Sequence, residues 1–158
     1  METNKLKWCF KIKDGLRIIE PNERLAKSYL EQSKASLLRA KKNFADNDLF
    51  WTTITIYYAE YYAIYSFLQS IGIKCENHAC SILAVNFLLG NEIIKTINEH
   101  KTKRIDAQYY MKIGKEKEIE NMIVEAQQFI VYFDELTSNT SEKEIVKYRE
   151  KLQQELKN

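Results

Sequence analysis

Residues 57–72 read YYAEYYAIYSFLQSIG, and this segment is the strongest indication of the architecture. At about 3.6 residues per turn, its tyrosines and aliphatic side chains cover most of the circumference of a helix, which predicts a helix buried on most sides. Asp48 can cap the start of this helix, and Gly72 can adopt the left-handed conformation that ends it. We therefore expect a long central helix at about residues 48–72, with the rest of the chain packed around it.

The same helix is apolar enough that a membrane span must be compared with a core helix. Residues 49–71 contain one charged side chain, Glu60, close to the middle of the segment. The tyrosines run along the whole segment, whereas those of a membrane span gather at its two ends. The amino-terminal residues are charged where a signal peptide needs a continuous apolar stretch. The sequence thus favours a soluble, cytoplasmic protein with no membrane partner.

The composition predicts one mainly α-helical domain over residues 1–158. Four glycines and one proline supply too few turn residues for an all-β fold of this length. Because 24 lysines and arginines face 22 aspartates and glutamates, the net charge of +2 gives no overall attraction to nucleic acid, and any such binding depends on local patches. Three cysteines, an odd number, are expected to be reduced thiols.

The first 21 residues are predicted to form an N-terminal β-hairpin. Residues 5–13 read KLKWCFKIK, in which Leu6, Trp8, Phe10 and Ile12 alternate with lysines and Cys9, a period of two that is typical of a half-buried strand. A second apolar run precedes Pro21. A three-residue loop around Asp14 and Gly15 places the apolar side chains of both strands on one face, with Gly15 in the left-handed conformation, whereas a two-residue loop mixes the faces.

The remainder is predicted to form an up-and-down helical bundle of four to five helices. Residues 22–136 form the bundle and residues 137–158 the C-terminal helix, which Ser141 and Glu144 begin with the spacing of a capping box. The segment at residues 100–114 is polar and basic, so we expect a loop there. Apolar side chains at helical spacing predict the helices themselves over residues 22–46, 48–72, 77–89, 92–99, 115–136 and from 141 onward.

His78 is the first candidate site residue. It stands at the start of a predicted helix, where backbone N–H groups attract anions, with Lys74 and Asn77 close by in the sequence. It could act as a general base or hold a phosphate, or it could simply cap the turn. Cys75 and Cys80 flank it, but thiols on either side of a helix start diverge. We therefore expect no metal and no cofactor.

A second candidate segment combines cations with an aromatic residue, namely Lys101, Lys103, Arg104 and Tyr109. Such a patch can bind phosphates and stack a base, although a solvated lysine loop is the simpler alternative. The tyrosines of the central helix could also hydrogen-bond a ligand, but burial alone explains their spacing. Core packing and a subunit interface are therefore expected of Tyr57, Tyr58, Tyr61, Tyr62 and Tyr65.

Five features follow one another in an informative order within residues 22–136. They are LAKSYL at 25–30, YYAIY at 61–65, Gly72 with His78, RIDAQY at 104–109 and AQQF at 126–129. This order resembles the HEPN superfamily of small α-helical bundles. The resemblance implies a homodimer, often encoded beside a minimal nucleotidyltransferase as a toxin–antitoxin pair. Many members of this superfamily are metal-independent ribonucleases whose active site contains an arginine followed, after about four to six residues, by a histidine. The resemblance therefore also raises ribonuclease activity as an expectation.

The chain departs from that ribonuclease pattern. None of its five arginines precedes His78 or His100 at the required distance, and the nearest substitute, Lys95 before His100, lacks the planar donor fork of arginine. We therefore expect a non-catalytic, dimeric binding module that acts with a nucleotidyltransferase partner, RNA or both. The alternatives are a ribonuclease toxin with a degenerate active site, using His78 or His100 as its catalytic histidine, and a nucleotide-binding sensor.

Overall fold

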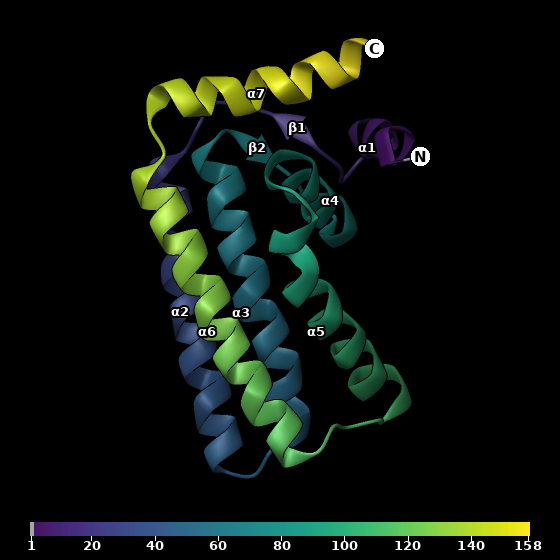
Figure 1. The fold of residues 1–158 in the computed structure, drawn as a ribbon, viewed down its shortest axis with the longest axis vertical. Helices are drawn as coiled ribbons and strands as arrows, with labels where there is room; N and C mark the ends of the chain where they lie inside the picture. The colour runs from purple at the N-terminus through teal and green to yellow at the C-terminus, as the bar shows by residue number, and fades with distance from the viewer. Residues whose placement is uncertain (1) are drawn as a thin grey trace.

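The computed structural model describes residues 2–158, with side chains from residue 4 onward. Helices α2, α3 and α6 run side by side, α5 flanks α3, and α7 crosses one end of the bundle (Figure 1). The prediction of a mainly α-helical protein is confirmed. The elements of the described residues are, in order, α1 (Glu2–Lys11), β1 (Arg17–Ile18), α2 (Glu23–Ala45), α3 (Leu49–Ser70), β2 (Ile73–Lys74), α4 (His78–Leu89), α5 (Asn91–Tyr110), α6 (Glu116–Asn139) and α7 (Glu142–Lys157).

The central helix α3 begins and ends as the sequence predicts. The Asp48 side chain accepts a hydrogen bond from the Trp51 amide at 3.1 Å, which satisfies a donor that the first helical turn leaves open. Gly72 follows the last turn with a φ of 76°. A Cβ at this position would collide with the carbonyl oxygen of Ile19, so Gly72 is required both for its conformation and for the close approach of the chain.

Helices α2 and α3 pack closely through small side chains. The buried hydroxyl of Ser33 on α2 donates to the carbonyl of Ala59 on α3 at 2.6 Å, and that of Ser66 on α3 donates to the carbonyl of Ala26 on α2 at 2.7 Å. Because alanines and serines occupy this contact, the two backbones can approach each other. The buried hydroxyls are hydrogen-bonded across the interface, which offsets the cost of removing them from water.

The predicted N-terminal β-hairpin is wrong. Residues 5–13 lie mostly in helix α1, where Leu6 and Cys9 are buried and Trp8 is 54% exposed. Only Arg17–Ile18 is a strand, and it pairs antiparallel with Ile73–Lys74, far along the chain. The alternating pattern misled because Leu6 and Cys9 are three residues apart and therefore also fit one face of a helix.

Gly15 is likewise not in the predicted left-handed conformation, since Gly72 and Gly90 are the glycines with positive φ in the described chain. Its role is steric. The backbone turns back so tightly after α1 that the amide of Leu16 donates to the carbonyl of Cys9 at 2.8 Å, and a Cβ on Gly15 would collide with that same carbonyl. A side chain at this position would push apart the turn that carries the chain from α1 to β1.

Cys9 and Cys80 form a disulfide, which corrects the expectation of reduced thiols. Their Cα atoms are 5.6 Å apart, and the bond ties α1 to the first turn of α4. Cys75 is a buried free thiol, and burial raises its pKa. The pairing was hidden because a strand over residues 5–13 would have placed Cys9 on the cationic face of a hairpin.

Residues 100–114 are not the predicted loop. Helix α5 continues without a break to Tyr110, and the connection to α6 comprises residues 111–115. The polar sequence stays helical because Ile94, Ile97, His100 and Ala107 form one buried stripe along it. At the carboxyl end, the predicted capping box of Ser141 and Glu144 is confirmed. No helix within residues 2–158 has the length and apolar character needed to cross a membrane.

Candidate functional site

His78 is held among the tyrosines of α3. It is the first residue of α4, and the side chain of the preceding Asn77 caps the helix by accepting a hydrogen bond from the Cys80 amide at 3.0 Å. The imidazole stacks on Tyr61 with 3.7 Å between ring centroids, and its Nδ1 lies 3.0 Å from the hydroxyl of Tyr57. These contacts fix the orientation of the ring while leaving it half-buried.

Two cations of α5 lie beside this histidine. The guanidinium carbon of Arg104 is 4.6 Å from the ring centroid of Tyr57 and 6.0 Å from that of Tyr58, within cation–π range. Arg104 donates from Nη1 to Gln108 at 3.1 Å, while its buried Nε has no hydrogen-bond partner. Lys101 is three residues earlier on the same helix. We name this group the His78 cluster; it consists of Tyr57, Tyr58, Tyr61, His78, Lys101 and Arg104.

The charges of the His78 cluster favour a neutral imidazole and a bound anion. Burial lowers the pKa of His78, and the positive charges of Arg104 and Lys101 lower it further. Burial also raises the pKa of Tyr57 to about 12, so the phenol stays protonated and can donate to Nδ1. The imidazole tautomer that accepts this hydrogen bond carries its own proton on Nε2, which makes Nε2 a donor.

The structure divides the predicted cations into two kinds. Lys74 forms an ion pair with Glu76 at 3.3 Å, and Lys103 forms one with Glu118 at 2.5 Å. By contrast, the two cations of the His78 cluster form no ion pair with a carboxylate among residues 4–158. Tyr109, also predicted to bind, is a 67% exposed residue on the last turn of α5, outside the cluster.

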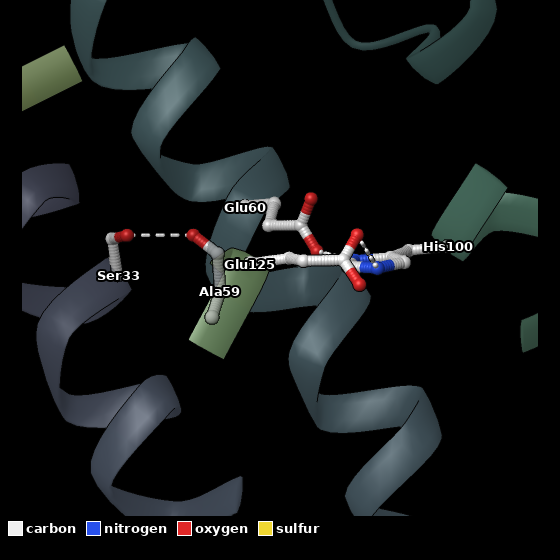
Figure 2. Close-up of polar contacts among 5 residues, drawn as sticks. All are labelled: Ser33, Ala59, Glu60, His100 and Glu125. Carbon is white, nitrogen blue, oxygen red and sulfur yellow. Dashed lines mark hydrogen bonds and ion pairs between the residues drawn. The ribbon is translucent and has the colours of Figure 1, made fainter. Parts of the chain in front are cut away.

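His100, the other candidate histidine, lies in a different environment. It is 2% exposed, and its Nδ1 is hydrogen-bonded to Oε1 of Glu60, a fully buried residue of α3. Its Nε2 is 3.5 Å from Oε2 of Glu125 on α6, so three helices meet at this ring (Figure 2). We name Glu60, His100 and Glu125 the His100 triad. A histidine so enclosed cannot reach a ligand at the surface, so the geometry gives no support to His100 as a catalytic residue.

The surroundings of His100 favour its protonated form. Burial by itself would lower the pKa of His100, but the hydrogen bond and negative charge of Glu60, together with Glu125 and Glu99, raise it above its ordinary value. Complete burial raises the pKa of Glu60, against the opposing effect of His100. Both directions favour one proton held between Nδ1 and Oε1. The outer oxygen of Glu60 and Nε2 of His100 have no hydrogen-bond partner.

Sequence reasoning missed the His100 triad, although one signal pointed to it. Glu60 is the one charged residue in an otherwise uncharged, buried segment, and a carboxylate so deep in a core requires a partner. That partner was hidden because residues 100–114 were predicted to be a loop. Extending the apolar stripe of Ile94 and Ile97 by one turn would have placed His100 on the buried face.

The tyrosine band predicted as an interface is largely covered by the chain itself. Tyr57, Tyr61 and Tyr65 are 0%, 5% and 9% exposed. Tyr58 and Tyr62 are half-buried, so these two are the members of the band that still present aromatic surface to another molecule. Burial is also the cause of the raised pKa of Tyr61 and of Tyr65, the latter to about 12.

Two depressions in the surface differ in their relation to this chemistry. A groove of about 250 Å³ between α4 and α5 includes Lys101 of the His78 cluster together with Asn91 and Asn98. A larger pocket of about 490 Å³ between α2, α6 and the start of α7 shares no residue with the cluster, and its Lys34 is already paired with Asp134 at 2.6 Å. In the described chain, no three His, Cys, Asp or Glu side chains are arranged to hold a metal ion.

Comparison of the chain with protein-family models, with curated proteins and with solved structures found no match. The two histidine environments are therefore the basis for assigning a function. The His78 cluster is partly open, and its cations have no partner carboxylate among residues 4–158, whereas the His100 triad is closed.

Proposed function

We propose that the chain is a non-catalytic, HEPN-like binding module that holds RNA or a nucleotide by its phosphate at the His78 cluster. The observation that carries this proposal is Arg104, half-buried against Tyr57 with no carboxylate partner among residues 4–158 and with its Nε unsatisfied. A guanidinium in that position favours an anionic partner, and phosphate oxygens match its planar array of donors. Lys101 and Nε2 of the neutral His78 add a charge and a donor beside it.

The surroundings of the cluster favour single-stranded RNA over a duplex. Tyr58 is half-buried next to Arg104 and offers a ring on which an unpaired base can stack. The adjoining groove adds the side-chain amides of Asn91 and Asn98, which can hydrogen-bond the edges of a base. Bases that are already paired in a duplex cannot use either feature.

Fluorescence anisotropy with a labelled single-stranded RNA of about twelve nucleotides tests this proposal. We expect the double variant Lys101→Gln, Arg104→Gln to bind about tenfold more weakly at moderate salt. The slope of log K against log[salt] should become shallower by about 1.4, because each lost phosphate contact contributes about 0.7 on a single strand. Lys103→Gln is the matched control: it removes one charge from the same helix, but that charge is already paired with Glu118.

Two outcomes would contradict the proposal. The first is a wild-type protein that does not bind the RNA even at low salt. The second is a double variant that binds as tightly as wild type, or one that loses no more affinity than Lys103→Gln, since the effect would then reflect overall charge instead of the cluster.

A metal-independent ribonuclease is the second candidate function, and a neutral imidazole beside Arg104 is the observation that favours it. Uncharged His78 could accept a proton from a ribose hydroxyl while Arg104 holds the phosphate. Incubating the same RNA with a chelator and either wild-type protein or His78→Ala separates the two functions. We expect equal background from both, because Nδ1 of His78 is already engaged by Tyr57. Cleavage by wild type alone would replace the binding proposal with the enzyme.

The HEPN resemblance also leads us to propose a homodimer that acts with a minimal nucleotidyltransferase as a toxin–antitoxin pair. Tyr62 and Tyr29 stack at 6.0 Å between centroids, and both are half-buried on the surface of α3 and α2. Tyr58 is half-buried on the same helix as Tyr62. Multi-angle light scattering at high protein concentration tests the dimer, and a monomeric mass would contradict it. A small nucleotidyltransferase in the adjacent reading frame would support the partner.

A further inference from the structure

We propose that the Glu60–His100 pair is a protonation-dependent positioning device for Arg104, so that the affinity of the His78 cluster for RNA falls when the pair loses its proton. This inference rests on the function proposed above, because it concerns the regulation of the same site. It assigns a role to a buried ionisable pair that cannot itself reach a ligand.

The pair and the site belong to the same helix contact. Glu60 follows Tyr57 by three residues on α3, and Arg104 follows His100 by four on α5, so each helix presents both of its residues on one face. The contact of His100 with Glu60 and that of Arg104 with Tyr57 are therefore neighbouring contacts, one helical turn apart, between two antiparallel helices. Any movement of α5 relative to α3 changes both contacts together.

The second half of α5 has few other buried anchors, and the ion pair of Lys103 with Glu118 on α6 joins two exposed side chains, so it holds the helix only weakly. The buried side chains of the first half of α5 are Ile94 and Ile97, and those from residue 98 onward are His100 and Ala107. Alanine contributes a single methyl group, so its burial holds the helix weakly. The orientation of the turn that carries Lys101 and Arg104 thus depends chiefly on the polar contact of His100 with Glu60.

The charged groups that act on His100 are all carboxylates, and they come from three helices. Glu60 faces it from α3, Glu125 from α6 at 3.5 Å, and Glu99 acts from α5 itself; α4, which also packs against α5, contributes no charged group to this set. These carboxylates move the loss of the proton to a pH above the ordinary histidine value of about 6.5. His100 therefore loses its proton at a higher pH than an ordinary histidine does.

Loss of the proton affects Arg104 in two ways. The imidazole no longer carries the charge that binds Glu60, so the contact between His100 and Glu60 that holds α5 in place weakens. In addition, Glu60 becomes a buried carboxylate without a counter-charge, one helical turn from Tyr57, on whose ring Arg104 lies. That negative charge attracts the guanidinium and repels a phosphate. Both effects lower the affinity for RNA as the pH rises.

The test is the pH profile of RNA affinity for wild type and Glu60→Gln. The glutamine keeps the shape of the side chain and can still accept from Nδ1, but it removes the charge that holds the proton. With the same labelled RNA, we expect the wild-type affinity to fall about tenfold as the pH is raised above about 6.5, and the Glu60→Gln profile to be flat over the same range. Glu125→Gln is the matched control. It removes the outer carboxylate, so the fall should remain but begin at lower pH.

A second measurement uses the wild-type protein alone, in case Glu60→Gln does not fold. Nuclear magnetic resonance of nitrogen-labelled protein follows the His100 ring and the Nε–H of Arg104 through the same titration. We expect both signals to change with one midpoint. An Arg104 signal that stays constant while His100 titrates overturns the inference, and so does a Glu60→Gln profile that falls like wild type. Absence of RNA binding by wild type would instead overturn the proposed function.

Discussion

His78 and His100 lie on neighbouring helices, yet cations surround one and carboxylates the other. His78 is half-buried beside Arg104 and Lys101, which add to the effect of burial and lower its pKa. His100 is fully enclosed, and Glu60 with Glu125 outweighs burial and raises its pKa. The same side chain is therefore shifted toward its uncharged form in one place and toward its protonated form, between three helices, in the other. The neighbours, and not the residue type, decide the role of a histidine.

Replacing each histidine by leucine should sharpen this difference most. We expect His100→Leu to lose about 3–5 kcal/mol of unfolding free energy, because Glu60 is left buried without its partner. His78→Leu should lose only about 1 kcal/mol, the value of its hydrogen bond to Tyr57. Urea denaturation measures both. The double variant Glu60→Leu, His100→Leu is the control and should recover most of the loss, since no unpaired charge remains. Equal losses from the two single variants would show that the two histidines do not differ in this way.

Removing the disulfide should affect the region of His78 and spare that of His100. The variant Cys9→Ser, Cys80→Ser is expected to lose about 2–4 kcal/mol, because the bond closes a long loop in the unfolded chain. Amide hydrogen exchange should accelerate in α1 and at the start of α4, with protection retained around His100. Cys75→Ser, which changes a free thiol, is the control for the loss of a cysteine as such. Uniform acceleration throughout the chain would show that the two regions are not separate.

The pH dependence of stability should show opposite signs for the two histidines, although the effect on stability is the smallest of the three. The lowered pKa of folded His78 means that its contribution is present above about pH 6.5 and is lost as the pH falls through the folded value. The raised pKa of folded His100 means that its contribution is complete below about pH 6.5 and is lost as the pH rises through the folded value.

Melting temperatures of wild type, His78→Leu and His100→Leu across about pH 5 to 9 measure these contributions. His78→Leu should flatten the acidic side of the curve and His100→Leu the alkaline side. If each variant flattened the opposite side, the assignment of charges to the two regions would have to be reversed.

The long helices could be predicted because their signals are local. Asp48 and Ser141 cap their helices as the sequence predicts. The apolar side chains of α3 recur at helical spacing over all of its 22 residues, so the pattern identifies a helix and not a strand. Helix α1 could not be predicted, since ten residues are too few to separate one period from another. Its position depends on the bond from Cys9 to Cys80 and on a strand pairing with Ile73–Lys74, both of which join distant parts of the sequence.

The candidate site was predictable in its parts and not in its arrangement. His78, Lys101 and Arg104 were recognised from residue type, but the pairing of Lys103 with Glu118 and the placing of Tyr57 under Arg104 are properties of three-dimensional packing. The contact between Glu60 and His100 joins residues separated by 40 positions. Sequence patterns of a few turns carry no information on which distant charge meets a buried one.

The bond between Cys9 and Cys80 also determines how the chain responds to mechanical load. Tension applied at the two ends would pass from residue 9 directly to residue 80 through the sulfur atoms, so the segment between them, which includes α2 and α3, would bear no force. In a pulling experiment, roughly 240 Å of chain could therefore not be extended until a reductant broke the disulfide.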